Sequence, residues 1–269
     1  MTEAGRAGQR ALLDRPERGG VALDFDGTLA DIVPDPDAAR ARPGAVDALA
    51  RLAPHVRSLA VITGRPAETA VHHGGFAHVP GLEHLVVLGL YGAERWEAAS
   101  GELTAPPPPP GLAAAREELP AVLAANGDFP GLWTEDKGQA VAVHTRRAAD
   151  PQGAFDALLA PLTALAGRHG LIVEPGRMVL ELRPPGVDKG KALTAHLAEV
   201  GATSVLYAGD DLGDLAAYAA VEAGRPGRPG LLLASGTEVP ELTVRADLPL
   251  PGGPEEVVAF LSALADTLS

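Results

Sequence analysis

Apolar runs alternate with segments of helical spacing in the first third of the chain and again after residue 186. The expected elements are strand 21–25, helix 45–53, strands 58–64 and 84–90, helix 188–201, strands 204–211 and 230–236, and helix 254–268. Alternating strands and helices are typical of a parallel sheet, because each crossover between strands carries a helix over the sheet. The pattern therefore predicts an α/β fold with a Rossmann-like parallel-sheet core and helices on both faces.

The middle of the chain has a different pattern. Five prolines, Pro106–Pro110, form a stiff segment that we interpret as a boundary rather than as a ligand for a proline-binding domain. The elements expected after it are helix 112–125, a half-exposed strand at 138–146, helix 154–169, and two strands within 171–184. They predict a small α+β sheet with helices on one face. We therefore expect a core formed by 1–108 and 187–269, interrupted by a smaller domain at 109–186.

Two of the predicted strands end in pairs of carboxylates. Asp24 and Asp26 lie at the end of the first strand, and Asp210 and Asp211 at the end of a later one, with Asp214 just beyond. The carboxyl ends of parallel strands meet at one edge of the sheet, where like charges repel. A hard divalent cation relieves that repulsion, and an all-oxygen ligand set favours Mg²⁺ over zinc. These aspartates therefore predict a Mg²⁺ site; the alternative is that they only cap helices and form turns.

Three more residues near these strand ends have chemistry that suits a phosphate. Thr63 and Arg65 lie at the end of the second predicted strand, and a threonine hydroxyl donates well to a phosphoryl oxygen. Lys189 opens the helix 188–201 and offers a compact positive charge beside the carboxylates. Taken alone, Thr63 is better interpreted as a turn residue and Lys189 as a solvated lysine. The adjacent His72 and His73 are interpreted as a loop feature rather than as a metal-binding pair.

Composition excludes several classes of protein. The formal net charge of −13 repels nucleic acid, whose binding depends largely on neutralised phosphates. The chain has no cysteine, so thiolate metal sites and cysteine nucleophiles are absent. It has no long apolar run and no apolar N-terminal segment, so we expect no membrane span and no signal peptide. A cytoplasmic protein without nucleic-acid partners is expected.

The chain carries, in order, four motifs that resemble those of the haloacid dehalogenase superfamily: Asp24-x-Asp26-Gly-Thr28, Thr63, Lys189, and Gly209-Asp210-Asp211-x-x-Asp214. The insert between the second and third motifs resembles the C2-type cap domain of sugar phosphatases. The stretches DFDGTLADIVPDPDAA, VITGR, LGLYGAERW, TEDKGQAVAVHTR and GRMVLELRP are similar to those of trehalose-6-phosphate phosphatases in particular.

This resemblance implies a Mg²⁺-dependent phosphatase that converts trehalose 6-phosphate into trehalose and phosphate. Asp24 would be the nucleophile that forms an aspartyl-phosphate, and Asp26 the general acid and then the general base. Thr63 and Lys189 would stabilise the charge of the transferred phosphoryl group. The implied metal ligands are Asp24, Asp26 and Asp210, with Asp211 or Asp214 close by or linked through water.

The resemblance also implies where the substrate's sugar binds. The matching charged residues are Glu135, Lys137, His144, Arg146, Arg177 and Glu181 in the inserted domain, and Arg65 in the core. Sugar hydroxyls suit charged partners of this kind. A trehalose-phosphate synthase of the same pathway is the one protein partner suggested. The alternatives are a phosphatase for sucrose phosphate or mannosylglycerate phosphate, and a catalytically weak regulatory homologue.

Three positions depart from the family's usual pattern. The fourth motif reads GDDLGDL, so Gly213 and Leu215 stand where the family usually has Thr and Glu. Tyr91 stands where His is more common. We expect the first two changes to alter the support around the metal, and Tyr91 to affect fine specificity rather than the chemistry.

Overall fold

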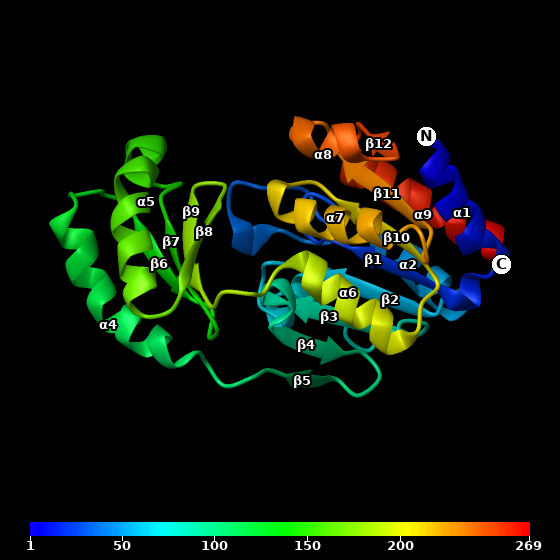
Figure 1. Cartoon of the computed structure of the whole chain (residues 1–269), viewed down its shortest axis with the longest axis horizontal. Coiled ribbons are helices and arrows are strands. Elements are labelled where there is room, and N and C mark those ends of the chain that lie inside the picture. The colour runs from blue at the N-terminus through cyan, green and yellow to red at the C-terminus, as the bar shows by residue number, and fades with distance from the viewer. The chain divides into compact units, whose positions relative to one another are not determined.

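A computed structural model describes all 269 residues, which fall into two compact units. The larger unit contains Met1–Ala105 and Val187–Ser269, and the smaller unit contains Pro106–Gly186. Figure 1 labels the helices and strands of both units along the chain. None of the helices is both long and apolar enough to cross a membrane.

The larger unit contains eight strands and seven α-helices. Its strands are β1 (Gly19–Leu23), β2 (Ser58–Ile62), β3 (Leu85–Gly89), β4 (Glu94–Glu97), β5 (Glu102–Thr104), β10 (Ser204–Gly209), β11 (Gly230–Ser235) and β12 (Leu248–Leu250). Its helices are α1 (Glu3–Asp14), α2 (Ala45–Leu52), α3 (Ala67–Gly74), α6 (Lys189–Val200), α7 (Leu215–Gly224), α8 (Pro240–Arg245) and α9 (Pro254–Leu268). Short 3₁₀ turns lie at Pro16–Arg18, Pro36–Ala38, Ala53–His55, Leu90–Gly92 and Leu212–Asp214.

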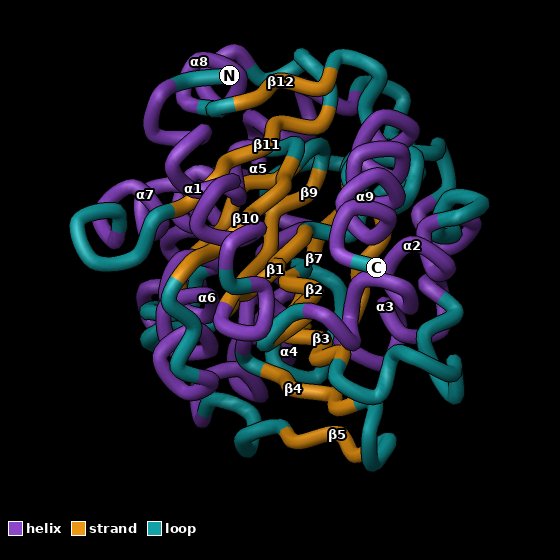
Figure 2. The backbone as a smooth tube through the Cα atoms, turned by 90° about the vertical axis from the view of Figure 1, so that its right-hand side faces the viewer, coloured by secondary structure: helices purple, strands orange, loops and turns teal.

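These strands form one sheet in the order β12-β11-β10-β1-β2-β3-β4-β5. Neighbouring strands are parallel from β12 to β3, and β4 and β5 extend the sheet with antiparallel pairing. Helices α2, α3 and α9 cover one face, while α6 and α7 cover the other (Figure 2). This arrangement confirms the predicted α/β class and its parallel core.

Strand β1 lies at the centre of this sheet, and this position accounts for its apolar sequence. Val21 and Leu23 are buried in the core on one face, and Ala22 in the core on the other. A strand covered on both faces needs an unbroken apolar run rather than alternation. Strand β1 pairs with β2 on one side and with β10 on the other. The two acidic strand ends predicted from the sequence are therefore neighbours.

The smaller unit is a four-stranded antiparallel sheet with two helices on one face. Its elements are α4 (Pro110–Ala125), β6 (Trp133–Asp136), β7 (Val141–His144), α5 (Pro151–Arg168), β8 (Ile172–Gly176) and β9 (Val179–Arg183). The strand order is β6-β7-β9-β8. Val143 and Leu180 of the sheet pack with Leu112 of α4 and Leu158 of α5 in a separate apolar core. The side chains of alternate strand positions point to the opposite face.

Several elements differ from the sequence-based expectation. Helix α1 was not expected: the glycines Gly5 and Gly8 weaken its helical pattern, and Thr2 caps it by accepting a hydrogen bond from the Gly5 N–H at 3.0 Å. The strand expected at 138–146 is shorter, and the pattern gave no separate strand for β6. His72 and His73 lie in the last turn of α3 rather than in a loop, so that interpretation is wrong.

Candidate active site

Pairing between β1 and β10 places Asp24 beside the end of β10. Leu23 is in register with Ala208, and the Asp24 N–H donates to the Ala208 carbonyl at 2.9 Å. The chain then turns, with the Phe25 carbonyl accepting hydrogen bonds from the N–H groups of Leu29 and Ala30. Phe25 is fully buried, so the turn is fixed to the core directly between the two aspartates.

Gly27 brings this turn close to Asp210. Its φ of +75° lies in the left-handed region, and a β-carbon there would come within 2.0 Å of the Asp210 carboxylate. The Ser235 hydroxyl at the end of β11 donates to the Gly27 carbonyl at 2.5 Å. The site therefore requires glycine for two reasons, backbone conformation and space.

Lys189 joins the two acidic strand ends. Its ammonium nitrogen lies 2.9 Å from Oδ1 of Asp24 and 2.7 Å from Oδ1 of Asp214, and its side chain is only 3% exposed. Burial disfavours the charged ammonium, but the carboxylates of Asp214 and Asp24 outweigh it and raise the Lys189 pKa well above its ordinary value. Lys189 is therefore a permanent positive charge in this site.

The carboxylate of Asp214 is fully engaged with protein donors. Oδ1 accepts hydrogen bonds from Lys189 and from the Tyr207 hydroxyl at 2.5 Å, and Oδ2 accepts from the N–H groups of Asp210 and Asp211 at 3.0 and 3.1 Å. A carboxylate has about four acceptor positions, and these bonds use four. Asp214 thus holds the loop and Lys189 in place.

The acidic cluster fits a divalent cation. Asp24, Asp210 and Asp214 each have a carboxylate oxygen within 4.8 Å of the others, and Oδ1 of Asp210 is buried with no hydrogen-bond partner. Burial, together with the nearby Asp24, raises the pKa of Asp210 to about 10. Burial also raises the pKa of Asp24, although Lys189 opposes the shift. A cation would stabilise both groups as carboxylates, and Asp210 has an oxygen to offer it.

Arg65 is bound to Asp26. Its Nε and Nη2 donate to Oδ2 and Oδ1 of Asp26, each at 2.6 Å, in a bidentate pair. Nη2 also donates to the Pro36 carbonyl at 3.0 Å, and Nη1 lies 3.2 Å from Nδ1 of His73. The guanidinium carbon lies 5.9 Å from the centre of the Phe25 ring. The structure thus places Arg65, expected from the family resemblance at the substrate, on the Asp26 carboxylate.

Thr63 lies at the end of β2, next to this pair. Its side chain is buried, and Oγ1 accepts a hydrogen bond from the Arg65 N–H at 3.1 Å. Its carbonyl accepts from the Tyr91 N–H at 2.9 Å. Tyr91 has a φ of +59°, and its ring lies against the open side of Gly64. Tyr91 therefore packs against the loop that follows β2.

The two departures in the fourth motif have local structural roles. The Gly213 N–H donates to Oδ1 of Asp211 at 2.9 Å, so Asp211 caps the turn that contains Gly213. Leu215 begins α7 and packs against the apolar core on that face of the sheet. Leu215 therefore contributes packing where a glutamate would contribute charge.

In the smaller unit, a group of polar residues lies on the sheet face opposite α4 and α5. Lys137 donates to Oε2 of Glu181 at 2.5 Å, and Nε2 of His144 lies 2.8 Å from the Glu135 carboxylate. Glu181 is 3% exposed, and its Oε1 is buried with no hydrogen-bond partner. An unpaired buried carboxylate oxygen is costly and suits a ligand with hydroxyl groups.

The remaining predicted residues of the smaller unit lie at a strand turn. Arg146 donates through Nη2 to the Arg177 carbonyl at 3.2 Å, in the connection between β8 and β9. The sequence did not single out Trp133, whose ring stacks on His144 at 4.4 Å between centroids. It also did not single out Arg183 and Glu174, which form an ion pair at 2.6 Å. A lone strand residue of any of these types has no sequence signal of its own.

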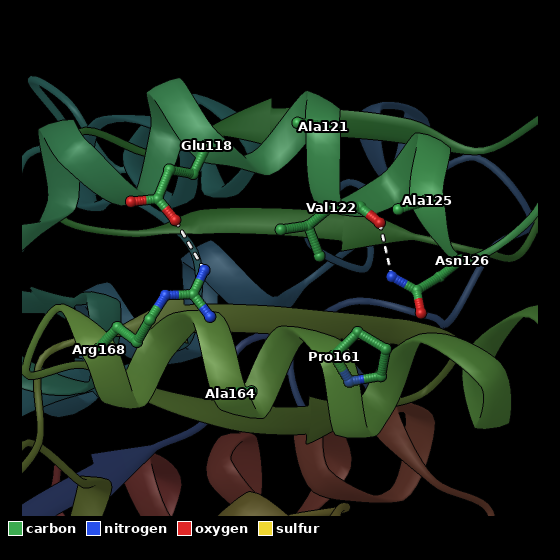
Figure 3. A pocket seen from close by; sticks show the side chains of 8 residues that line it. All are labelled: Glu118, Ala121, Val122, Ala125, Asn126, Pro161, Ala164 and Arg168. Atoms are coloured by element: carbon green, nitrogen blue, oxygen red, sulfur yellow. Dashed lines mark hydrogen bonds and ion pairs between the residues drawn. The ribbon is translucent and has the colours of Figure 1, made fainter.

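Figure 3 shows a groove on the helical side of the smaller unit, between α4 and α5, with a volume of about 380 Å³. It is lined by Glu118, Ala121, Val122, Ala125, Asn126, Pro161, Ala164 and Arg168. Glu118 and Arg168 form an ion pair across it at 2.7 Å. None of the residues predicted to be functional lines this groove.

Comparison with known proteins gives the family. Residues 22–235 match the family model described as trehalose-phosphatase. The chain is 38% identical over 217 residues to the trehalose-phosphate phosphatase of Mycobacterium tuberculosis, covering 74% of this chain and 50% of that protein. It is 40% identical over 225 residues to the one from Mycobacterium avium, covering 76% and 51%. The chain thus spans about half the length of the curated relatives it matches.

A solved structure shares the fold. The C-terminal domain of a trehalose-6-phosphate phosphatase from C. albicans superimposes with a TM-score of 0.75 at 21% sequence identity, covering 98% of this chain and 97% of that one. At this identity the likeness concerns the fold alone. The extent of the family-model match and the identity to the mycobacterial proteins confirm the resemblance seen in the motifs. This chain belongs to the trehalose-phosphatase family.

Proposed function

We propose that this chain is a Mg²⁺-dependent phosphatase that hydrolyses trehalose 6-phosphate to trehalose and inorganic phosphate. The observation that carries the proposal is the Asp24 carboxylate, held 2.9 Å from the buried Lys189 ammonium and beside the unpartnered oxygen of Asp210. A nucleophile, a fixed positive charge and a free metal ligand are what phosphoryl transfer to a carboxylate requires.

In the first half of the reaction, an Asp24 oxygen attacks phosphorus and the bond from phosphorus to the sugar oxygen breaks. The leaving oxygen takes a proton from Asp26, so that trehalose departs as a neutral alcohol. Lys189 stabilises the negative charge of the phosphoryl oxygens, and the Thr63 hydroxyl offers a hydrogen bond to them.

In the second half, water attacks phosphorus and the bond from Asp24 to phosphorus breaks, which releases phosphate. Asp26 takes the proton of that water and so regains the proton that it gave to the sugar. Asp24 and Asp210 would hold the metal, with Asp26, Asp211 and Asp214 in supporting positions. When bound, Mg²⁺ would neutralise charge on the phosphoryl oxygens.

Recognition of the sugar is proposed for the polar face of the smaller unit. Glu181 and Lys137 are paired but leave Oε1 of Glu181 unbonded, and Glu135 and His144 form a second pair on the same sheet. Arg146 and Arg177, at the strand turn, are further residues proposed to contact the sugar. A site that leaves polar groups unpaired favours ligands whose hydroxyls can reach them. In a pathway, a trehalose-phosphate synthase would supply the substrate.

The test is phosphate release from a panel of sugar phosphates with Mg²⁺ present. The panel contains trehalose 6-phosphate, sucrose phosphate, mannosylglycerate phosphate and glucose 6-phosphate, with Asp24→Asn as the inactive control. The highest kcat/KM is expected with trehalose 6-phosphate. A preference for another disaccharide phosphate would support phosphatase activity but contradict the assignment of trehalose 6-phosphate as the substrate. Absence of turnover on every sugar phosphate would favour the regulatory homologue.

A further inference from the structure

His73 contacts Asp26 indirectly, through the guanidinium group of Arg65. Its ring nitrogen Nδ1 lies 3.2 Å from Nη1 of Arg65, whose other nitrogens bind both oxygens of Asp26. A guanidinium N–H can only donate, so Nδ1 of His73 must accept and the ring must carry its proton on Nε2. His73 is 7% exposed, although its neighbour His72 on the same helix is exposed.

The environment of His73 favours this neutral, accepting form. Burial lowers the His73 pKa, and the positive charges of Arg65 and Arg40 lower it further, together with His72; only Asp26 opposes them. The backbone carbonyl of His73 accepts the Ala41 N–H at 3.1 Å, which fixes the end of α3 independently of the ring. The ring therefore serves to accept the hydrogen bond from Arg65.

Arg65 in turn fixes the orientation of Asp26. Segments that are distant in the sequence hold the guanidinium: the turn after β1 through Asp26, the 3₁₀ turn at Pro36, and helix α3 through His73. Both Asp26 oxygens accept hydrogen bonds, as the carboxylate form does, and each oxygen keeps one further acceptor position. That is the form of Asp26 that receives a proton from water.

We infer that His73 is a positioning residue that acts through Arg65 to orient Asp26 as the general base of the second half-reaction. The inference rests on the proposed function. In that step the water oxygen bonds to phosphorus, the bond between Asp24 and phosphorus breaks, and one water proton moves to Asp26. Without the acceptor at His73, Arg65 loses one of the hydrogen bonds that hold it, and the Asp26 carboxylate becomes mobile. Release of phosphate from Asp24 then slows. Formation of the phosphoenzyme does not depend on this orientation when the ester has a good leaving group, because no proton from Asp26 is then needed.

The test uses His73→Leu, which keeps bulk but removes the acceptor, with His73→Asn as the conservative variant and His72→Leu as the matched neighbour. The substrate is p-nitrophenyl phosphate, whose good leaving group needs no general acid. For His73→Leu we expect kcat to fall by about tenfold, a part of the roughly 10²–10⁴-fold contribution of acid–base catalysis. KM should fall in parallel, and a burst of p-nitrophenol should appear as phosphoenzyme accumulates.

His73→Asn should restore most of kcat, because its amide oxygen can stand near the position of Nδ1. His72→Leu should change kcat by less than about twofold, as expected for a surface substitution. In an Arg65→Lys background, His73→Leu should add little further loss, because both changes act through one contact. A structural role would predict equal losses in kcat and kcat/KM, no burst, and additive effects with Arg65→Lys. Any of those three results would overturn the inference.

These experiments also distinguish failure of the proposed function from failure of the inference about His73. If the wild-type protein turns over p-nitrophenyl phosphate but not trehalose 6-phosphate, the substrate assignment fails and the His73 comparison stands. If acid-quenched wild-type protein carries no phosphate at Asp24 and His73→Leu accumulates none, the covalent intermediate is excluded and the inference falls with it.

Discussion

Gly27 shows how much of the site depends on the absence of a side chain. Gly27→Ala would force a φ of +75° on an alanine and place its β-carbon within 2.0 Å of the Asp210 carboxylate. We expect affinity for Mg²⁺ to fall by about tenfold or more, equivalent to roughly 1.4 kcal/mol, because Asp210 must move. Calorimetric titration with Mg²⁺ measures this change.

Gly101→Ala is the matched control, since Gly101 has a similar φ of +71° and a β-carbon added there would meet no other atom within 4 Å. It carries the conformational cost without the clash. If both variants lost the same affinity for Mg²⁺, backbone strain alone would explain the effect, and the contact between Gly27 and Asp210 would not matter.

His196 is a second residue whose environment predicts a measurable property. It is buried, and its Nε2 lies 2.5 Å from the Ser58 hydroxyl. Burial lowers the His196 pKa, and Arg95 adds to this, while Glu199 opposes it. A histidine whose pKa is lower in the folded state contributes stability above its unfolded pKa of about 6.5, and that stability is lost as the pH falls below it.

Between pH 7.5 and pH 5.5, the Tm of the wild-type protein should therefore fall further than that of His196→Gln, which does not titrate. A difference of about 1 kcal/mol corresponds to roughly 2–4 °C in a protein of this size. Differential scanning calorimetry at both pH values checks this. Parallel decreases in the two proteins would show that other groups cause the acid sensitivity.

At the scale of elements, strand β9 carries the residue on which sugar specificity depends in our proposal. Glu181→Gln keeps the shape of the side chain but removes the charge opposite Lys137. We expect kcat/KM for trehalose 6-phosphate to fall by about ten- to a hundredfold, the scale of a lost charge-assisted hydrogen bond of roughly 1.5–3 kcal/mol. The loss on p-nitrophenyl phosphate, which has no sugar, should be much smaller. Equal losses of kcat/KM on the two substrates would show that Glu181 stabilises the smaller unit and does not bind the sugar.

The elements also show which features a sequence pattern can predict. Strands β1, β2, β3, β10 and β11 are short apolar runs because both faces of the sheet are covered, and such runs are visible in one sequence. Strands β4, β5 and β12 lie at or near the sheet edges and are only three or four residues long. Their pairing depends on the neighbouring strand rather than on their own composition.

For the site, the family resemblance implied roles for the acidic residues, but the residue pattern did not specify the contacts of each carboxylate. Nothing local distinguishes Asp214, which accepts four hydrogen bonds, from Asp210, which keeps an oxygen free. The contact of Arg65 with His73 depends on how α3 packs, which residue spacing does not specify. The sequence therefore predicted which residues gather at the sheet edge, while their hydrogen-bond partners depend on tertiary contacts.

At the scale of the whole molecule, removal of the proposed Mg²⁺ should have the largest effect on activity. Exhaustive chelation should abolish phosphatase activity but leave the fold intact, because the apolar cores do not include the acidic cluster. Adding Mg²⁺ at about 100 times its Kd should stabilise the protein by about 2.7 kcal/mol. The Mg²⁺-induced rise in Tm should disappear in Asp210→Asn. Full turnover after chelation would contradict the metal assignment.

The order of strands in the larger sheet also bears on how the protein is made. Strand β1 leaves the ribosome well before β10, which pairs one of its two edges and begins at Ser204, after the whole smaller unit has been synthesised. At about 5–20 residues per second, that edge stays open for on the order of ten seconds or more. An unpaired apolar edge strand invites association with other nascent chains. Because the predicted active site combines β1 with β10, whose sequences are separated by the smaller unit, we expect this edge to be exposed to association throughout the synthesis of that unit.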